Sequence, residues 1–445
     1  MQPTIPRPQQ HAGRHAATGL LHTRLSLMMF LQFFIWGAWF VTLGTFLGQT
    51  LQAGAGQIGQ AFSTQSWGAI VAPFFVGLLA DRFFNAERVL AVLHLVGAVL
   101  LFSMAQATDF QSFYPLVLAY MLAYMPTLAL VNSVAFHQLT DASRQFGAIR
   151  VWGTVGWIAA GLAISYLFGW DSQQAIQHGA LANTFYLASG ASVLLGLYSL
   201  SLPATPPVKG KATLRQLLGL DALALLKDRN FLLFFVSSLL ICIPLAFYYQ
   251  NANPFLTQIG VANATGKMTL GQVSEVLFML VLPLFLLRFG IRWTLIAGMA
   301  AWVLRYLLFA FGDAADGVWL LLLGIVLHGI CYDFFFVSGQ IYTDSKAQAA
   351  IRTQAQGLIT LATYGIGMLI GFAVAGQVTA TYTSTAAVTD WQQVWLFPAG
   401  FAGVVLVLFV LLFKQEQGAM LPPRDTGADE SSAGTRSDQS PVERV

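Results

Sequence analysis

The 445-residue sequence contains little charge. Only 9% of its residues are Asp, Glu, Lys or Arg, whereas a typical soluble domain has about 25%. Because 56% of the residues are hydrophobic, a water-soluble fold would lack the polar side chains needed to cover its surface. The composition excludes an ordinary soluble enzyme, and the net charge of +3 indicates no nucleic-acid partner.

Cysteine and the motifs of soluble enzymes are scarce or missing. The two cysteines, Cys242 and Cys331, fall inside apolar runs, so a disulfide framework or redox chemistry is not indicated. The sequence has no Walker-type phosphate loop, no His-Glu-x-x-His helix and no Gly-x-Ser-x-Gly turn. We therefore expect no enzyme, no bound metal and no cofactor.

Long apolar runs are abundant. They have about 20 residues each, the length that a helix needs to cross about 30 Å of hydrocarbon, and Gly, Pro or charge separates them. The sequence predicts an all-α integral membrane protein with twelve transmembrane helices. These spans are 25–48, 61–80, 87–106, 112–138, 146–169, 179–202, 230–252, 269–288, 291–312, 317–342, 350–376 and 391–413.

Lys and Arg gather on alternate connections between these spans. The connections after the even-numbered spans carry Arg82, Arg88, Arg144, Lys209, Lys211, Arg215, Lys227, Arg229, Arg288 and Lys346. The opposite connections have essentially Lys267 alone, together with acids such as Asp109 and Asp390. Because cytoplasmic loops carry the excess of basic residues, both termini are predicted to be cytoplasmic.

A charged connection of 27 residues divides the spans into two groups of six. The pattern QLTD followed by IR at 138–150 recurs as QIYTD followed by IR at 340–352, as expected for a transporter built from parallel repeats. An amphipathic stretch in the connection predicts an interfacial helix. The predicted organisation is an N-terminal cytoplasmic segment (1–24), a first half (25–202), a linker (203–229), a second half (230–413) and a disordered cytoplasmic tail (414–445).

A few charged residues fall inside the predicted spans, where each costs about 3 kcal/mol or more and needs a partner, a wet cavity or a function. Arg150, Thr154 and Trp157 follow helical spacing, so that a guanidinium, a hydroxyl and an aromatic ring share one face. Such a face suits a base or a sugar ring. The alternative is that Arg150 only anchors the end of its helix.

Two carboxylates fall in the second half. Gln272 and Glu275 are three residues apart on one helix face, which suits a ligand with hydroxyl or amide groups, although a structural hydrogen bond between helices is the alternative. Asp333 follows His328 and Tyr332 well inside a span. A membrane carboxylate that a proton can neutralise suits proton coupling, unless Asp333 belongs to a permanent structural ion pair.

Three further positions complete the polar inventory of the spans. Tyr249 lies near Pro254, where a helix should bend or end, and aromatic residues at a membrane interface would also explain this part of the sequence. Arg305 is expected to form a structural ion pair. His94 lies in a peripheral span and is placed outside the site.

The stretch GLLADR at 77–82, with a further Arg at 88, resembles the cytoplasmic gating motif of the major facilitator superfamily. This resemblance implies that Gly77, Asp81, Arg82 and Arg88 hold helix ends together in one conformational state and release them in another. An ordinary charged loop is the alternative.

The sequence as a whole resembles the nucleoside:proton symporter family of that superfamily over about residues 25–415. The stretches on which this resemblance rests are LQFFIWGAW at 31–39, AYMPTL at 123–128, IRVWGT at 149–154, SE at 274–275, WVLR at 302–305, FAFGD at 309–313, DFF at 333–335 and DWQQVW at 390–395. The resemblance implies two six-helix halves around a central cavity and uptake of nucleosides with protons.

Matching positions suggest roles for individual residues. Those for substrate are Arg150, Thr154, Trp157, Tyr249, Gln272, Glu275, His328 and Tyr332, and those for proton coupling are Asp333 and Glu275. Trp157 and Tyr332 stand where the family has Phe, and His328 stands where it has Tyr. Polar amides expected at Ala246 and Tyr249 are absent, so the resemblance supports proton coupling more strongly than a nucleoside cargo.

The leading hypothesis is a nucleoside:proton symporter that works by alternating access in the cell inner (plasma) membrane, as a monomer. Its partners would be the substrate, protons and the lipid bilayer. A proton-coupled transporter of a sugar, polyol or other small polar metabolite is the main alternative. A membrane sensor without transport is the remaining one, and the retained intramembrane charges argue against it.

Overall fold

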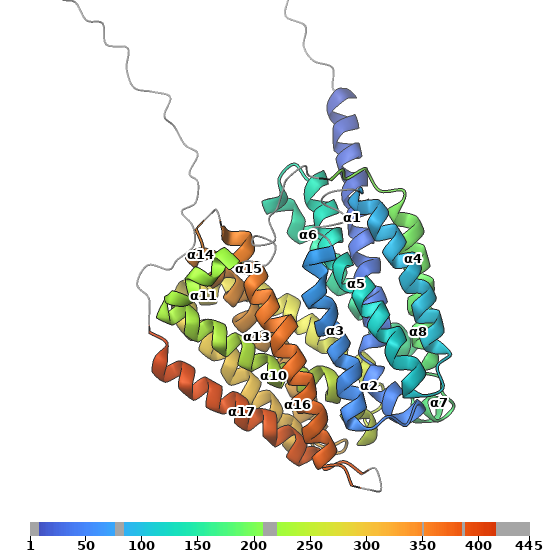
Figure 1. The fold of residues 1–445 in the computed structure, drawn as a ribbon, viewed down its shortest axis with the longest axis vertical. Helices are drawn as coiled ribbons and strands as arrows, with labels where there is room; N and C mark the ends of the chain where they lie inside the picture. The colour runs from blue at the N-terminus through green and yellow to red at the C-terminus, as the bar shows by residue number, and fades with distance from the viewer. Residues whose placement is uncertain (1–8, 76–83, 208–219, 349–350, 385–387, 415–445) are drawn as a thin grey trace, which may run out of the picture.

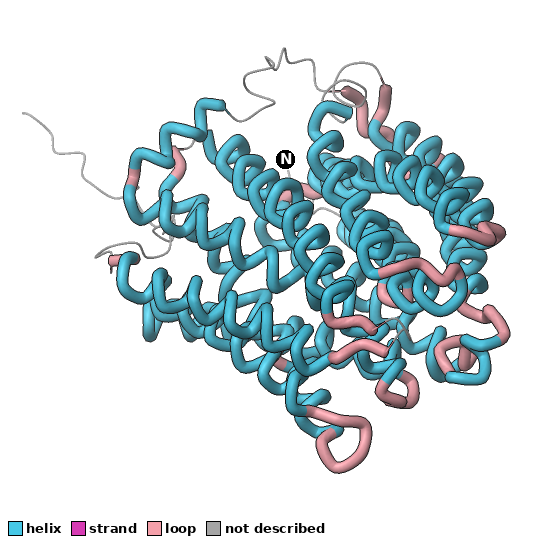
Figure 2. Tube along the Cα trace, turned by 60° about the horizontal axis from the view of Figure 1, so that its bottom comes forward, coloured by secondary structure: helices cyan, strands magenta, loops and turns pink. Residues whose placement is uncertain are grey.

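The computed structural model describes residues 9–75, 84–207, 220–348, 351–384 and 388–414. Over these ranges the chain consists of helices and loops, with one isolated β-bridge between Thr383 and Thr389. Figure 2 shows the helices as long tubes joined by short loops. The all-helical prediction is confirmed for this part of the chain.

The first part of the chain forms one group of helices. They are α1 (Gln9–Phe40), α2 (Leu43–Thr45), the π-helix η1 (Phe46–Thr50), α3 (Ala55–Phe75), α4 (Ala86–Ala105), α5 (Phe110–Gln138), α6 (Ala142–Leu162), the π-helix η3 (Ala163–Leu167), α7 (Gln173–Gln177) and α8 (Ala182–Ser199). Within this group α1 packs against α6 and α8, and α4 packs against α5 and α8.

The second part forms another group. It comprises the 3-10 helix η4 (Leu220–Lys227), α10 (Arg229–Gln258), α11 (Ala264–Phe311), α12 (Val318–Val326), α13 (His328–Tyr332), the π-helix η5 (Asp333–Val337), α14 (Ser338–Lys346), α15 (Arg352–Thr360), the π-helix η7 (Leu361–Gly367), α16 (Met368–Thr381) and α17 (Trp391–Leu412). Here α10 packs against α16 and α17, and α11 packs against α13 and α17.

The two groups lie side by side and meet along two pairs of helices. In Figure 1 the blue-to-green helices occupy one side and the yellow-to-red helices the other. α3 packs against α16, and α6 packs against α11. Any cavity between the groups is therefore bounded by these two helix contacts.

The outer surface of the helices is apolar. Side chains such as Val99, Leu197, Leu280 and Leu411 are 66%, 57%, 72% and 73% exposed. Monomeric soluble proteins rarely expose contiguous apolar surface on this scale, so this surface fits contact with lipid. Nine helical stretches of the described residues are long and apolar enough to cross a membrane, fewer than the twelve spans that the sequence predicts.

α11 is counted once among the nine although it is unusually long. Its 48 residues would extend about 72 Å as a straight helix, more than twice the thickness of the hydrocarbon. The backbone leaves the helical region at Gly290, with φ of 73° and ψ of 174°. This conformation suits glycine and separates two helical stretches of about equal length.

Other boundaries differ from the sequence prediction. α10 continues through Pro254 to Gln258, so this proline does not end the helix. The predicted interfacial helix of the linker is described only as η4, which packs against α10 and α15 through Ala222. The tail beyond residue 414 lies outside the described residues.

Acidic side chains cap several helices. The carboxylates of Asp109, Asp228 and Asp390 accept hydrogen bonds from the third backbone N–H that follows, at 2.8, 2.7 and 3.2 Å. Such caps satisfy N–H groups that have no partner within the helix. The backbone N–H of Ser112 also lowers the pKa of the exposed Asp109 carboxyl, so this cap stays charged to a lower pH than an ordinary Asp.

Candidate functional site

A cavity lies between the two helix groups, about halfway along the packed helices. α1, α3 and α6 line it from the first group, and α10, α11, α13 and η7 line it from the second. All eight residues predicted for substrate contact line this one cavity: Arg150, Thr154, Trp157, Tyr249, Gln272, Glu275, His328 and Tyr332. We call it the central cavity.

Glycines allow α6 to approach α1 closely and so build the first wall of the central cavity. A Cβ atom at Gly37 would lie 3.0 Å from the backbone of Trp157, and one at Gly153 would lie 2.6 Å from the Phe33 ring. Small residues of this kind let membrane helices pack backbone to backbone. As a result the ring of Trp157 lies against that of Trp36, with centroids 5.5 Å apart.

Arg150 is held over an aromatic ring on the same wall. Its guanidinium carbon lies 4.2 Å from the centroid of Phe33, a cation–π contact. This contact leaves the guanidinium beside the cavity, where it can donate hydrogen bonds to a ligand. Thr154 and Trp157 follow on the same helix face, as their spacing predicts.

The opposite wall depends on a close approach of α11 and α13. A Cβ atom at Gly329 would collide with Ser274, and one at Gly271 would lie 3.2 Å from the Cβ of His328. The Ser274 hydroxyl also accepts a hydrogen bond from the Gly329 backbone N–H at 3.1 Å. This packing brings Glu275, the residue after Ser274, next to His328.

His328 connects a buried arginine to the carboxylate in the cavity. Arg305 Nη1 lies 3.0 Å from His328 Nδ1, and His328 Nε2 lies 3.9 Å from Glu275 Oε2. Because a guanidinium can only donate, Nδ1 must accept, and the hydrogen of the neutral imidazole is assigned to Nε2. The central cavity therefore has a fixed N–H donor beside a carboxylate acceptor.

Aromatic rings surround Arg305, which is fully buried. Its guanidinium carbon lies 3.4 Å from the centroid of the Tyr248 ring and 5.5 Å from that of Trp302. The structural ion pair that the sequence suggested is not present, because no acidic side chain of the described residues lies within ion-pair distance. Cation–π contacts and the hydrogen bond to His328 take its place.

Asp333 is buried next to the central cavity without lining it. Its side chain is fully inaccessible, and neither carboxylate oxygen has a hydrogen-bond partner in the part of the chain that the structure describes. Asp333 also begins the π-helix η5, a distortion that is frequent at functional sites. The preceding residue, Tyr332, forms a hydroxyl-to-hydroxyl hydrogen bond with Tyr364 of η7.

The predicted gating residues are only partly visible. Gly77, Asp81 and Arg82 lie outside the described residues. Arg88 is exposed in the first turn of α4. The structure therefore leaves the gating role a prediction.

The lining of the central cavity contains residues that the sequence did not single out. They are Phe33, Trp36, Phe40, Gln65, Gly153 and Tyr364. Gln65 is an amide inside a predicted span, where a polar side chain is costly, and this could have identified it. Aromatic residues in an apolar helix have no comparable pattern.

His94 belongs to a separate buried network, consistent with its placement outside the site. Its Nε2 lies 2.8 Å from Gln32 Oε1, and its Nδ1 lies 3.2 Å from Ser192 Oγ. Gln32 in turn donates to Thr127 Oγ1 at 2.7 Å. The network joins α1, α4, α5 and α8, and its cost in an apolar interior is offset because the polar groups pair with one another.

The central cavity has the features of a binding site for a small polar molecule, and its lining residues do not indicate covalent chemistry. It combines hydrogen-bond donors, a carboxylate, amides and aromatic rings from two helix groups, inside a protein with an apolar outer surface. Binding sites between two helical groups near the middle of the membrane are typical of secondary transporters. The fold and the site define a multi-pass membrane transporter.

Comparison with known proteins identifies the family. The family model described as nucleoside H+ symporter matches residues 20–418, so the chain belongs to this family. The Escherichia coli (strain K12) protein YegT is 46% identical over 403 residues, covering 88% of this chain and 93% of YegT. The nucleoside permease NupG of the same organism is 36% identical over 411 residues, covering 88% of this chain and 96% of NupG.

A solved structure has the same fold. The crystal structure of the nucleoside transporter NupG matches with a TM-score of 0.78 at 34% identity, covering 89% of this chain and 100% of that chain. The predicted family and its transport function, rather than an enzymatic one, are confirmed.

Proposed function

We propose that this protein imports nucleosides together with protons by alternating access. Membership of the nucleoside H+ symporter family supports this proposal. The observation that carries it is that the eight predicted substrate residues, from both helix groups, surround one cavity. A nucleoside has an aromatic base and a ribose with hydroxyl groups, and this cavity offers partners for both.

The substrate would be held by rings and by directed hydrogen bonds. Trp157 of the first group and Tyr249 of the second provide aromatic surface for the base, and Arg150 provides donors on the wall that carries Trp157. The donor at His328 Nε2 and the acceptor at Glu275, 3.9 Å apart, suit a group that accepts and donates at neighbouring atoms. Ribose hydroxyls and the amide edge of a base both have this property.

Protons would bind at Asp333 and Glu275. Both are carboxylates in the apolar interior, and no basic residue described in the structure forms an ion pair with Asp333. A charged carboxylate is costly in this interior, so the protonated and the ionised carboxyl favour different packings of the surrounding helices. Coupling follows if the conformation that closes around the substrate prefers the protonated form.

The proposed topology has twelve spans in two halves, with both termini cytoplasmic. Besides the nine membrane-length stretches, α3, α8 and the part of α11 after Gly290 would supply the remaining three. The halves correspond to residues 25–202 and 230–413, with a cytoplasmic linker between them. The alternation of Lys and Arg between connections supports this orientation. We propose the bacterial inner membrane as location and a monomer as the working unit.

Uptake into vesicles tests this function. Purified protein in proteoliposomes should accumulate radiolabelled uridine and adenosine when an inward proton gradient is imposed, and only equilibrate them without it. The variant Asp333→Asn should lose accumulation and keep downhill exchange. The matched variant Asp316→Asn, at an exposed loop position, should behave as the wild type.

Two results would contradict the proposal. Unchanged concentrative uptake by Asp333→Asn would remove the proton role of this carboxylate. Inhibition by free sugars without inhibition by nucleosides would show that the cargo is a sugar-like metabolite, the alternative that the sequence left open.

A further inference from the structure

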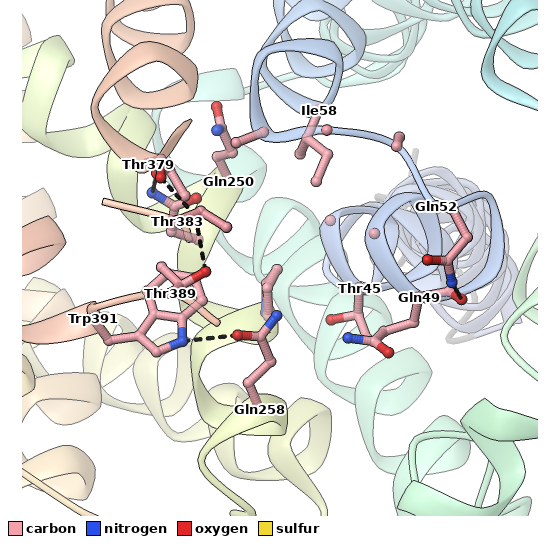
Figure 3. A pocket seen from close by; sticks show the side chains of 17 residues that line it. Thr45, Gln49, Gln52, Ile58, Gln250, Gln258, Thr379, Thr383, Thr389 and Trp391 are labelled. Atoms are coloured by element: carbon pink, nitrogen blue, oxygen red, sulfur yellow. Dashed lines mark hydrogen bonds between the residues drawn. The ribbon is translucent and has the colours of Figure 1, made fainter. Parts of the chain in front are cut away.

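A second cavity lies between the two helix groups, at one end of their interface, and Figure 3 shows it from close by. It has a volume of about 430 Å³, within the range of roughly 300–1,000 Å³ for ligand pockets. Residues of segments 44–58 of the first group and 250–258 of the second line it, together with Thr379, Thr383, Thr389 and Trp391. We call it the vestibule.

The vestibule is polar but has no charge. Four Gln, one Asn, four Thr and one Trp supply its polar side chains, and the described residues that line it include no Asp, Glu, Lys, Arg or His. A charged ligand would find no counter-charge there. An uncharged molecule with several hydroxyl or amide groups would find both donors and acceptors.

The orientation of one amide is fixed by its neighbour. Trp391 Nε1 donates to Gln258 Oε1 at 3.0 Å, so the Gln258 Nε2 group points into the open space (Figure 3), where it has no partner among the described residues. Gln49 extends from the opposite wall toward the same space. Two amides from different helix groups therefore face one opening.

Paired hydroxyl and amide groups form the remaining wall. Thr383 Oγ1 and Thr389 Oγ1 lie 3.0 Å apart, and Asn251 Nδ2 donates to Thr379 Oγ1 at 3.0 Å. Hydroxyl oxygens in such pairs keep unused lone pairs. Neighbouring hydroxyls on a ligand, each both donor and acceptor, complement this arrangement.

The vestibule and the central cavity are separate cavities, because they share no lining residue in the described part of the chain. Phe40 lines the central cavity, and its ring centroid lies 5.2 Å from that of Phe62 and 6.0 Å from that of Tyr249. Phe62 in turn contacts Phe372 of the other helix group, at 5.5 Å. A ligand in the vestibule would therefore occupy a site distinct from the central cavity.

We propose that the vestibule is a second substrate site, which binds an uncharged molecule through neighbouring hydroxyl groups before it enters the central cavity. This chemistry is shared by the ribose of a nucleoside and by a free sugar. That the occupant is the transported nucleoside rests on the function proposed above, whereas the preference for an uncharged hydroxylated ligand rests on the lining alone.

Protection of an introduced cysteine tests the proposal. Gln49 is exposed at the vestibule, and the natural Cys242 and Cys331 are both buried, so a Gln49→Cys variant should react with a polar thiol reagent at that position alone. Saturating uridine should slow the reaction at least threefold. A Gln111→Cys variant, exposed at the start of α5 and outside the vestibule, should show no protection.

Variants of the two cavities separate direct binding from a change of conformation. Protection of Cys at position 49 should persist when Arg150→Ala and Glu275→Gln disable the central cavity. It should disappear with Gln258→Leu and remain with Gln392→Leu, an exposed neighbour outside the lining. Loss of protection in the central-cavity variant would overturn the proposal, because occupancy of the central cavity would then account for the effect.

The choice of ligand separates this proposal from the proposed function. Protection by uridine and not by 2′,3′-dideoxyuridine supports recognition of hydroxyls, and equal protection by both would overturn it. Protection by ribose alone would support the vestibule while contradicting a nucleoside cargo. Absence of protection by both uridine and ribose would overturn the vestibule site and leave the transport assay to decide the function.

Discussion

Replacement of Arg305 by Met is expected to impair transport much more than folding. Met keeps an unbranched apolar stem that reaches about as far as the Arg Nε atom, and it removes the hydrogen bond to His328 and the cation–π contact with the Tyr248 ring. These interactions contribute about 1.5–3 kcal/mol and about 2 kcal/mol. The burial of a cation in the membrane interior costs about 3 kcal/mol or more, so the net loss of folding free energy should be below about 2 kcal/mol.

The effect on transport has a different origin. Without the Arg305 donor, either nitrogen of His328 can carry the hydrogen, and the N–H donor beside Glu275 is no longer fixed. The loss of one directed hydrogen bond, about 1–1.5 kcal/mol, corresponds to about a tenfold lower kcat/KM for uridine. Thermal unfolding of the purified variant and initial uptake rates in proteoliposomes measure the two effects.

A matched control lies on the same helix. Arg292→Met removes a partly buried arginine that donates to a backbone carbonyl at 2.9 Å, away from the central cavity, and should leave uptake near the wild-type rate. If Arg305 were half of a buried ion pair, its removal would destabilise the protein by about 3–5 kcal/mol. A loss of that size, or wild-type uptake by Arg305→Met, would refute the role that we assign to this residue.

Two further predictions concern the packing of helices around the central cavity. Asp171 accepts a hydrogen bond from a backbone N–H of α11 at 3.0 Å and so links the two groups. Asp171→Asn should weaken this link and raise thiol labelling of a Thr269→Cys variant, buried where α11 contacts Gly161 of α6, about tenfold, for a loss of about 1.4 kcal/mol. Gly329→Ala should lower uridine uptake at least tenfold, since its Cβ would collide with Ser274. Gly357→Ala, where a Cβ meets nothing within 4 Å, should leave uptake unchanged.

Much of the candidate site could be predicted from the sequence because polar residues are costly inside a membrane. Arg150 and Glu275 are charged residues within apolar runs, and an internal cavity is the place where their charge costs the least free energy. The structure places both on one cavity. The same argument applies to His328. Its hydrogen bond to Arg305 could not be predicted, because it depends on how α11 packs against α13, and no local sequence pattern encodes that packing.

Other features could not be predicted for physical reasons. Lipid makes the outer face of each helix as apolar as its inner face, so that Phe33 and Tyr364 have no periodicity that distinguishes them from lipid-facing rings. The vestibule is made by three distant segments, and only their packing reveals it.

The measurement that tests the central claim most directly is proton entry driven by substrate. Proteoliposomes that contain a pH-sensitive dye and start without a gradient should acidify inside when uridine is added outside, at a rate that rises with uridine concentration. Asp333→Asn should abolish the acidification and leave uridine exchange. Uridine uptake by the wild-type protein without any internal acidification would contradict proton-coupled import.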